Sequence, residues 1–156
     1  MLWYMSMKKI IKFILVLFWM SLIFYMSAQV ANESSETTNI VIDVLYKIYC
    51  FFIRDNRIDI LSFSNIVFVP VRKLAHFIEF AILGILVFIN IKEYLNKNTV
   101  IISIILSIIY ATSDEVHQLF VPGRAFGIKD ILIDSCGAIA GIFFIYLVLK
   151  RWIKKQ

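Results

Sequence analysis

The sequence predicts an all-α membrane protein, a polytopic bundle of about four transmembrane helices with one short amphipathic helix at the interface. Of the 156 residues, 61% are hydrophobic and 17% are charged, whereas soluble domains are about 45–50% apolar and about 25% charged. Four apolar runs reach the length of roughly 20 residues that crosses a bilayer. The polar residues gather at the ends of these runs. The chain is therefore expected to form a single membrane domain over residues 1–156.

Lys8 and Lys9 precede the first run, residues 10–31, and Lys12 lies near its start. A basic flank followed by an apolar run predicts a first transmembrane helix. It is also typical of a cleaved signal peptide, because small residues around Ser27 could form a cleavage site. We favour the uncleaved span, and both interpretations place the following segment outside the cell.

The segment after the first span is expected to lie in the outer interface. Polar residues 32–39 predict a turn, and residues 40–53 predict a short helix. Asp43, Lys47 and Arg54 fall on one stripe of this helix at 100° per residue, which makes it amphipathic. It is too short to span a bilayer comfortably, so it is expected to lie along the membrane surface.

Three further spans follow, separated by turn-forming and polar residues. Residues 60–69 are expected to form a short apolar connector that ends at Pro70, at the first position of a helix, where the missing N–H costs nothing. Pro122 and Gly123 end the third span. The predicted spans are residues 71–91, 99–120 and 128–149.

The basic residues predict the orientation of the chain. Most short flanks rich in lysine and arginine fall on one side of a four-span topology, and that side is expected to be cytoplasmic, with both termini. These residues are Lys8, Lys9, Lys12, Lys92, Lys97, Lys150, Arg151, Lys154 and Lys155. Because the remaining basic residues lie on the opposite side, the net charge of +5 does not predict nucleic-acid binding.

This topology sends three polar clusters to the outer face. The second span begins with Arg72, His76 and Glu79, which share a helix face. The third span ends with Asp114, His117 and Gln118, which also share a face. Ionisable groups at membrane depth cost about 2.5–3.5 kcal/mol each on insertion scales, and they usually mark a functional site.

The fourth span begins with the third cluster, Asp130 and Asp134, and Arg124 lies in the turn before it. Small residues follow, because Gly137 and Gly141 form a GxxxG pair on the same side as the two aspartates. Close packing there would seat the carboxylates against a neighbouring helix. We expect that helix to belong to the same chain, and a dimer interface is the alternative.

The residue types suggest roles. Histidine and carboxylates suit general acid–base catalysis, which selects His76, Glu79, Asp114 and His117 as candidate catalytic residues. Arginine suits phosphate binding through its bidentate fork. The candidate substrate-binding residues are Arg72, Lys73, Gln118, Arg124, Asp130 and Asp134. Glu115 is expected to face away from Asp114 and Gln118.

A divalent metal is a possible cofactor, but no diagnostic ligand spacing predicts one, and no metal ligand is assigned. The ligand types present are His76, Glu79, Asp114, Glu115, His117 and Asp134. No nucleophile elbow, Walker loop or HExxH motif is present.

Three spaced motifs within residues 71–141 resemble the VanZ-like family. They are Arg72-Lys73-x-x-His76-Phe-x-Glu79, then Ser113-Asp114-Glu115-x-His117-Gln118 with Pro122-Gly-Arg124, then Asp130-x-x-x-Asp134-x-x-Gly137. The resemblance implies a bacterial cell-membrane protein of the envelope that affects susceptibility to teicoplanin-type antibiotics. The chain departs from the family pattern after the last aspartate, where no asparagine follows one turn later.

Three functional hypotheses remain open at this stage. The first is an enzyme that acts on a lipid or lipid-linked envelope substrate at the outer face. The second is non-catalytic binding of a lipid headgroup, a glycopeptide or a lipopeptide in the same pocket. The third is a structural network in which the arginines neutralise the carboxylates and lock the helix ends together, since buried polar groups must find partners. Membrane lipids are the expected partners in each case.

Overall fold

The part of the chain that the structure describes forms a bundle of five helices. The computed structural model describes residues 2–53, 58–94 and 98–153, and in these ranges it contains no strand. The basic residues Arg54, Lys97, Lys154 and Lys155, used above for the helix stripe and the orientation, lie outside the described residues. The helices are α1 (Leu2–Ser27), α2 (Ala31–Ile53), α3 (Ile60–Lys92), α4 (Thr99–Gln118) and α5 (Ile128–Ile153).

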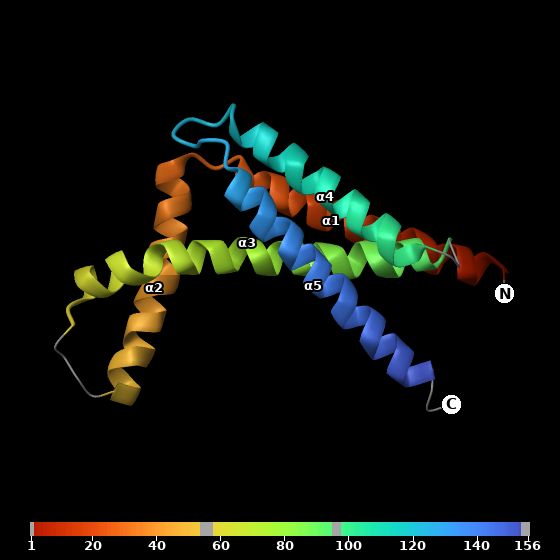
Figure 1. Ribbon diagram of the computed structural model, residues 1–156, viewed down its shortest axis with the longest axis horizontal. Helices are drawn as coiled ribbons and strands as arrows, with labels where there is room; N and C mark the ends of the chain where they lie inside the picture. Colours follow the sequence, from red (N-terminus) through yellow and green to blue (C-terminus); the bar gives the residue numbers. More distant parts are fainter. Residues whose placement is uncertain (1, 54–57, 95–97, 154–156) are drawn as a thin grey trace.

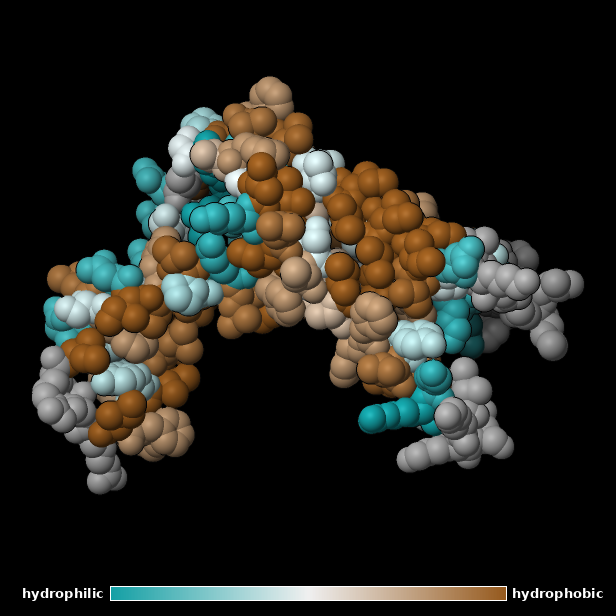
Figure 2. Space-filling model, viewed as in Figure 1, coloured by the Kyte–Doolittle hydropathy of each residue, from teal (hydrophilic) through white to brown (hydrophobic). Residues whose placement is uncertain are grey.

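Four of these helices, α1, α3, α4 and α5, are long and apolar enough to cross a membrane, which confirms the predicted number of spans. They alternate in direction, so the two chain ends lie at one end of the bundle and the α4–α5 turn at the other (Figure 1). We call these the terminal end and the loop end. Large apolar side chains cover the surface between them (Figure 2), as a lipid-facing surface requires.

Helix α3 begins eleven residues earlier than the span predicted at residues 71–91. Asp59 caps it by accepting a hydrogen bond from Ser62 N at 3.2 Å, and Phe63 packs against the rings of Tyr46 and Tyr49 of α2. These contacts make residues 60–69 helical, and Pro70 lies inside the helix rather than at its start. The expected connector was therefore wrong. At ~1.5 Å per residue, the 33 residues extend about 50 Å, well past a hydrocarbon core of ~30 Å.

Helix α2 also begins earlier than predicted, at Ala31 rather than residue 40, so the expected polar turn is helical. Thr37 and Thr38 donate side-chain hydrogen bonds to the carbonyls of Glu33 and Ser34, at 3.3 and 3.0 Å. Such bonds to the preceding turn keep short polar side chains compatible with a helix. The helix runs across α3 rather than alongside it (Figure 1), which fits the predicted interfacial position.

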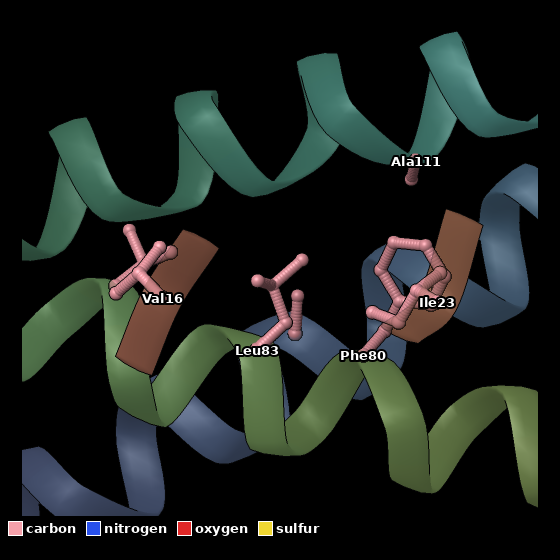
Figure 3. Packing of buried hydrophobic residues seen from close by; sticks show 7 residues of the cluster. Val16, Ile23, Phe80, Leu83 and Ala111 are labelled. Atoms are coloured by element: carbon pink, nitrogen blue, oxygen red, sulfur yellow. The ribbon is translucent and has the colours of Figure 1, made fainter. Parts of the chain in front are cut away.

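The core of the bundle is small and lies between α1, α3, α4 and α5, where Ala138 of α5 is fully buried. Ile23 of α1, Phe80 and Leu83 of α3, and Ala111 of α4 are each at most 2% exposed. Figure 3 shows Phe80 and Ile23 side by side beneath Ala111. Because α1 supplies part of this core, it is an integral member of the bundle.

Helices α3 and α5 approach each other at backbone contact. A Cβ on Gly137 would lie 2.2 Å from Phe77 O, and one on Gly141 would lie 2.0 Å from Ala81 O. Gly84 of α3 meets Ala138 O in the same way, at 2.3 Å. Only glycine permits such an approach, so the GxxxG pair packs within the chain, as predicted. Phe77 and Ala81 pair with Gly137 and Gly141 in the same order, so the two helices run parallel.

Candidate functional site

His76 of α3 lies between two carboxylates at the loop end. Its Nδ1 is 3.9 Å from Glu79 Oε2 and 3.9 Å from Asp134 Oδ1. Both distances exceed that of a hydrogen bond. Among the residues that the structure describes, none forms a hydrogen bond with His76 Nδ1 or with either carboxylate oxygen of Asp134. The predicted face of Arg72, His76 and Glu79 thus meets the aspartate of α5.

The glycine contact between α3 and α5 places Asp134 there. Gly137 touches the backbone of Phe77, the residue that follows His76. Asp134 lies three residues before Gly137, on the same face of α5. The aspartate is consequently pressed against α3, with only 1% of its surface exposed. A larger residue at position 137 would separate Asp134 from His76.

Asp114 of α4 joins the end of α1 to the site. It is 2% exposed, and its Oδ2 accepts hydrogen bonds from Ser27 Oγ at 2.7 Å and from Gln118 Nε2 at 3.2 Å. Ser27 was noticed in the sequence only as a possible cleavage position, and nothing in its spacing indicates this contact. Burying the carboxylate requires such partners.

Glu115 is also buried, but it points toward the start of α5, whereas Asp114 bonds to Ser27 of α1. Glu115 is 2% exposed, and its Oε2 accepts a hydrogen bond from Gly127 N at 2.8 Å. The sequence carries a signal for this position, because Ser103, Ser107 and Ala111 precede Glu115 at four-residue intervals and all are buried. Glu115 thereby holds the start of α5 against α4.

Arg124 ties the α4–α5 turn to the end of α1. Its Nε donates to Gln29 O at 3.0 Å and its Nη2 to Met26 O at 3.3 Å, so it satisfies carbonyls at and just beyond a helix C-terminus. Nη1 is buried and forms no hydrogen bond to the described residues. Burial lowers the pKa of the Arg124 guanidinium, and Arg72 acts in the same direction. Arginine nevertheless stays protonated at physiological pH.

The other predicted residues differ in their relation to this site. Lys73, Gln118 and Asp130 line a polar cavity at the loop end. His117 lines neither of the two cavities described below, and its ring stacks on Phe24 of α1 with centroids 4.2 Å apart. The structure therefore does not bring the two histidines together.

Two cavities meet at Arg72, His76 and Arg124, which line both. The first, of about 380 Å³, lies between α1, α2 and α3 and has mostly apolar walls, including Leu45 and Ile78. The second, of about 290 Å³, is lined mainly by residues of α3 and of the α4–α5 turn. Several of the residues that line it are charged. A space that is apolar on one side and charged on the other matches the two parts of an amphiphile.

Of the carboxylates and histidines, His76, Glu79, Glu115 and Asp130 line one or both cavities, whereas Asp114, His117 and Asp134 line neither. Among the described residues, no three His, Cys, Asp or Glu side chains converge closely enough to hold a metal ion.

The fold and the site define a polytopic helical membrane protein with a polar pocket at one end of its bundle. Residues 12–150 match the family described as VanZ/LLP1, and the chain belongs to this family, as the three motifs predicted. No curated protein matches the chain significantly. No solved structure matches it either.

Proposed function

We propose that the protein binds the anionic headgroup of an envelope lipid, or of a lipid-linked envelope precursor, and modifies it at the loop end. The single observation behind this proposal is the meeting of an apolar and a charged cavity at Arg72, His76 and Arg124. An acyl or isoprenoid chain fits the apolar cavity between α2 and α3. The headgroup then reaches the charged cavity.

Two guanidinium groups provide the anion site. Arg72 lines both cavities, and the unpartnered Nη1 of Arg124 is available for a ligand oxygen. Paired arginines suit a phosphate because each can present two N–H donors. Lys73, Gln118 and Asp130 line the charged cavity and would contact the rest of the headgroup.

His76 is the best-placed group for acid–base chemistry. Its ring lines both cavities and lies 3.9 Å from the carboxylates of Glu79 and Asp134. In this proposal His76 transfers a proton to or from the headgroup, and the two carboxylates orient the imidazole. Asp114 acts indirectly, because the hydrogen bond that it accepts from Ser27 holds α1 and α4 together.

The loop end is proposed to face the outside of a bacterial cell membrane. The excess of lysine and arginine near the terminal end favours a cytoplasmic location for both termini. Envelope precursors and glycopeptide antibiotics meet at the outer surface. A change in the lipid there would alter susceptibility to teicoplanin-type glycopeptides.

Susceptibility measurements in cells test the proposal. His76→Gln and Arg124→Gln should each abolish the effect of the protein on the teicoplanin inhibitory concentration, with unchanged amounts of protein in the membrane. His117→Gln is the comparison, because its ring contacts Phe24 and lines neither cavity. Equal loss in all three variants, or unchanged susceptibility in the first two, would contradict the proposal.

Non-catalytic binding is the second candidate, and one observation favours it. Asp114 and Arg124 are engaged in hydrogen bonds that connect helices, so part of the cluster is structural. Purified protein incubated with envelope lipids distinguishes the two candidates. A new lipid product by mass spectrometry that is absent with His76→Gln supports catalysis, and bound lipid recovered unchanged supports binding alone.

A further inference from the structure

A third cavity, of about 310 Å³, lies between α1, α3 and α4, toward the terminal end. It shares no lining residue with the two cavities of the loop end. On α3, Glu79 lines the apolar loop-end cavity and Leu83 lines this one, and Phe80 between them is fully buried and lines neither. The third cavity is therefore separate from the proposed site.

Its walls are mostly hydrocarbon, with a few polar groups. Val16 of α1 and Leu83 of α3 are two of the apolar walls, and Figure 3 shows them close together below α4. Among the polar lining residues, Tyr110 donates its hydroxyl to Met20 O at 2.6 Å, and Ser113 donates to Tyr110 O at 2.7 Å. These two hydroxyls are satisfied within the protein.

Asn90 and Ser107 are different. They line the cavity, they are 8% and 1% exposed, and Asn90 Nδ2 and Ser107 Oγ have no hydrogen-bond partner among the described residues. An unpaired polar group within a bilayer is unfavourable, because no water is present to replace the missing partner. Two such groups in one cavity indicate a ligand that accepts hydrogen bonds and is otherwise apolar.

The depth of Asn90 identifies the acceptor. Asn90 lies three residues before Glu93, which caps α3 and pairs with Lys12 of α1. At ~1.5 Å per residue, the amide is about 5 Å inside this charged end of the helix. The polar layer on each side of a bilayer is ~5–8 Å thick, so Asn90 lies near its inner boundary. Ester carbonyls of glycerolipids occupy this depth.

The charge near the cavity identifies the headgroup, because Lys9 lies one helical turn before Phe13, which lines the cavity. Lys8, Lys9 and Lys12 lie in the first turns of the apolar part of α1, and Lys9 is placed over the ring of Tyr94 at 5.3 Å from its centroid. Only Glu93 offsets them among the described acidic residues at this end. Such a cluster attracts anionic lipids.

We propose that this cavity binds one acyl chain of an anionic glycerophospholipid from the leaflet at the terminal end. The chain lies along Val16, Leu83 and the other apolar walls. An ester carbonyl accepts a hydrogen bond from Asn90 Nδ2, Ser107 lies deeper in the same cavity, and the phosphate lies beside Lys9. This site does not depend on the function proposed for the loop end.

Lipid binding by the purified protein tests the proposal. Dioleoylphosphatidylglycerol and dioleoylphosphatidylcholine are titrated in detergent, and bound lipid is measured by native mass spectrometry. Phosphatidylglycerol should bind more tightly, and Asn90→Leu should weaken its binding roughly three- to tenfold, as expected for the loss of one hydrogen bond. Lys9→Gln should reduce only the preference for phosphatidylglycerol.

Asn65→Leu is the matched control, since Asn65 is exposed on the same helix and lines none of the three cavities. It should bind lipid like the unmodified protein. Thermal unfolding adds a measurement that does not rely on counting lipids. Lipid-free Asn90→Leu should unfold at a higher temperature than the unmodified protein and gain less from phosphatidylglycerol. Equal lipid affinity and equal thermal gain in all variants, or no preference for phosphatidylglycerol, would overturn the proposal.

Discussion

The two ends of the bundle differ in how exposed their charged side chains are and in whether these side chains have partners. At the terminal end, Lys12 and Glu93 form an ion pair with about a third of each side chain exposed. At the loop end, Asp134 is 1% exposed and forms no hydrogen bond to the described residues. An exposed pair contributes little to stability, whereas a buried carboxylate without hydrogen bonds is costly. This difference supports the proposal that the loop end retains its charged groups for a function, and the terminal end for topology.

The largest effect on stability is expected when the contact between α3 and α5 at the loop end is disrupted. Gly137→Val should destabilise the protein by ~1–3 kcal/mol or more, because its side chain would overlap the backbone of Phe77. The loop end should open, since Asp134 and His76 are held by this contact. Thermal stability in detergent measures the effect. Ala140→Val, on an exposed face of the same helix, is the control, and equal loss in both variants would contradict the close contact.

Asp134→Asn should stabilise the protein by ~1–3 kcal/mol, because an uncharged amide costs less to bury than a carboxylate that has no hydrogen-bond partner. The same variant should lose the proposed function. Glu93→Gln at the terminal end should show neither gain in stability nor loss of function. The measurements are thermal unfolding and teicoplanin susceptibility. A fall in the unfolding temperature of Asp134→Asn would mean that the carboxylate has a partner in the folded protein.

Ser27→Ala should destabilise the protein by ~1–2 kcal/mol, because Asp114 would keep only the longer hydrogen bond from Gln118. Ser21→Ala provides a matched control on the same helix. Its hydroxyl is exposed and donates only to Leu17 O, one turn earlier. Thermal unfolding of the two variants compares a bond between helices with a bond within one helix. Equal effects would show that the Ser27–Asp114 contact contributes little.

The smallest effect is expected at the terminal end, in the pH dependence of the Lys12–Glu93 pair. The hydrogen bond from Lys12 holds the pKa of Glu93 below its usual value of 4.5. A lowered pKa means that the pair stabilises the folded state above pH 4.5 and that this contribution is lost as the pH falls through the folded-state pKa. Its size should not exceed ~1 kcal/mol, since both side chains are exposed. Unfolding temperatures of the unmodified protein and Glu93→Gln should converge in acid, and a growing difference would contradict this assignment.

The sequence predicted the architecture well because hydrophobic length and composition alone determine which segments can cross a bilayer. Helix starts were harder to predict. Pro70 suggested a helix start, but the contacts of Phe63 with Tyr46 and Tyr49 extend α3 back to Ile60. Those contacts join residues from different helices, and no local pattern reveals them.

For the candidate site, too, the features that depend on local pattern were predictable, and those that depend on contacts between helices were not. Helical periodicity placed Arg72, His76 and Glu79 on one face, and the GxxxG pair predicted the close neighbour of Asp134. Periodicity could not show that His117 would meet Phe24 instead of His76, because that depends on where α1 lies. The small residues that precede Glu115 at four-residue intervals could have predicted its burial. The charged residues next to Glu115 masked this pattern.

The parallel packing of α3 and α5 has a consequence for biogenesis. The two helices that form the backbone contact are separated in the chain by α4, so α5 leaves the ribosome after both α3 and α4. His76 and Glu79 therefore enter the bilayer before Asp134 exists. Until α5 inserts, the groove on α3 that Gly137 and Gly141 will fill is open to lipid or to a chaperone. Insertion of α5 brings its glycines against α3 and Asp134 beside His76 in one step.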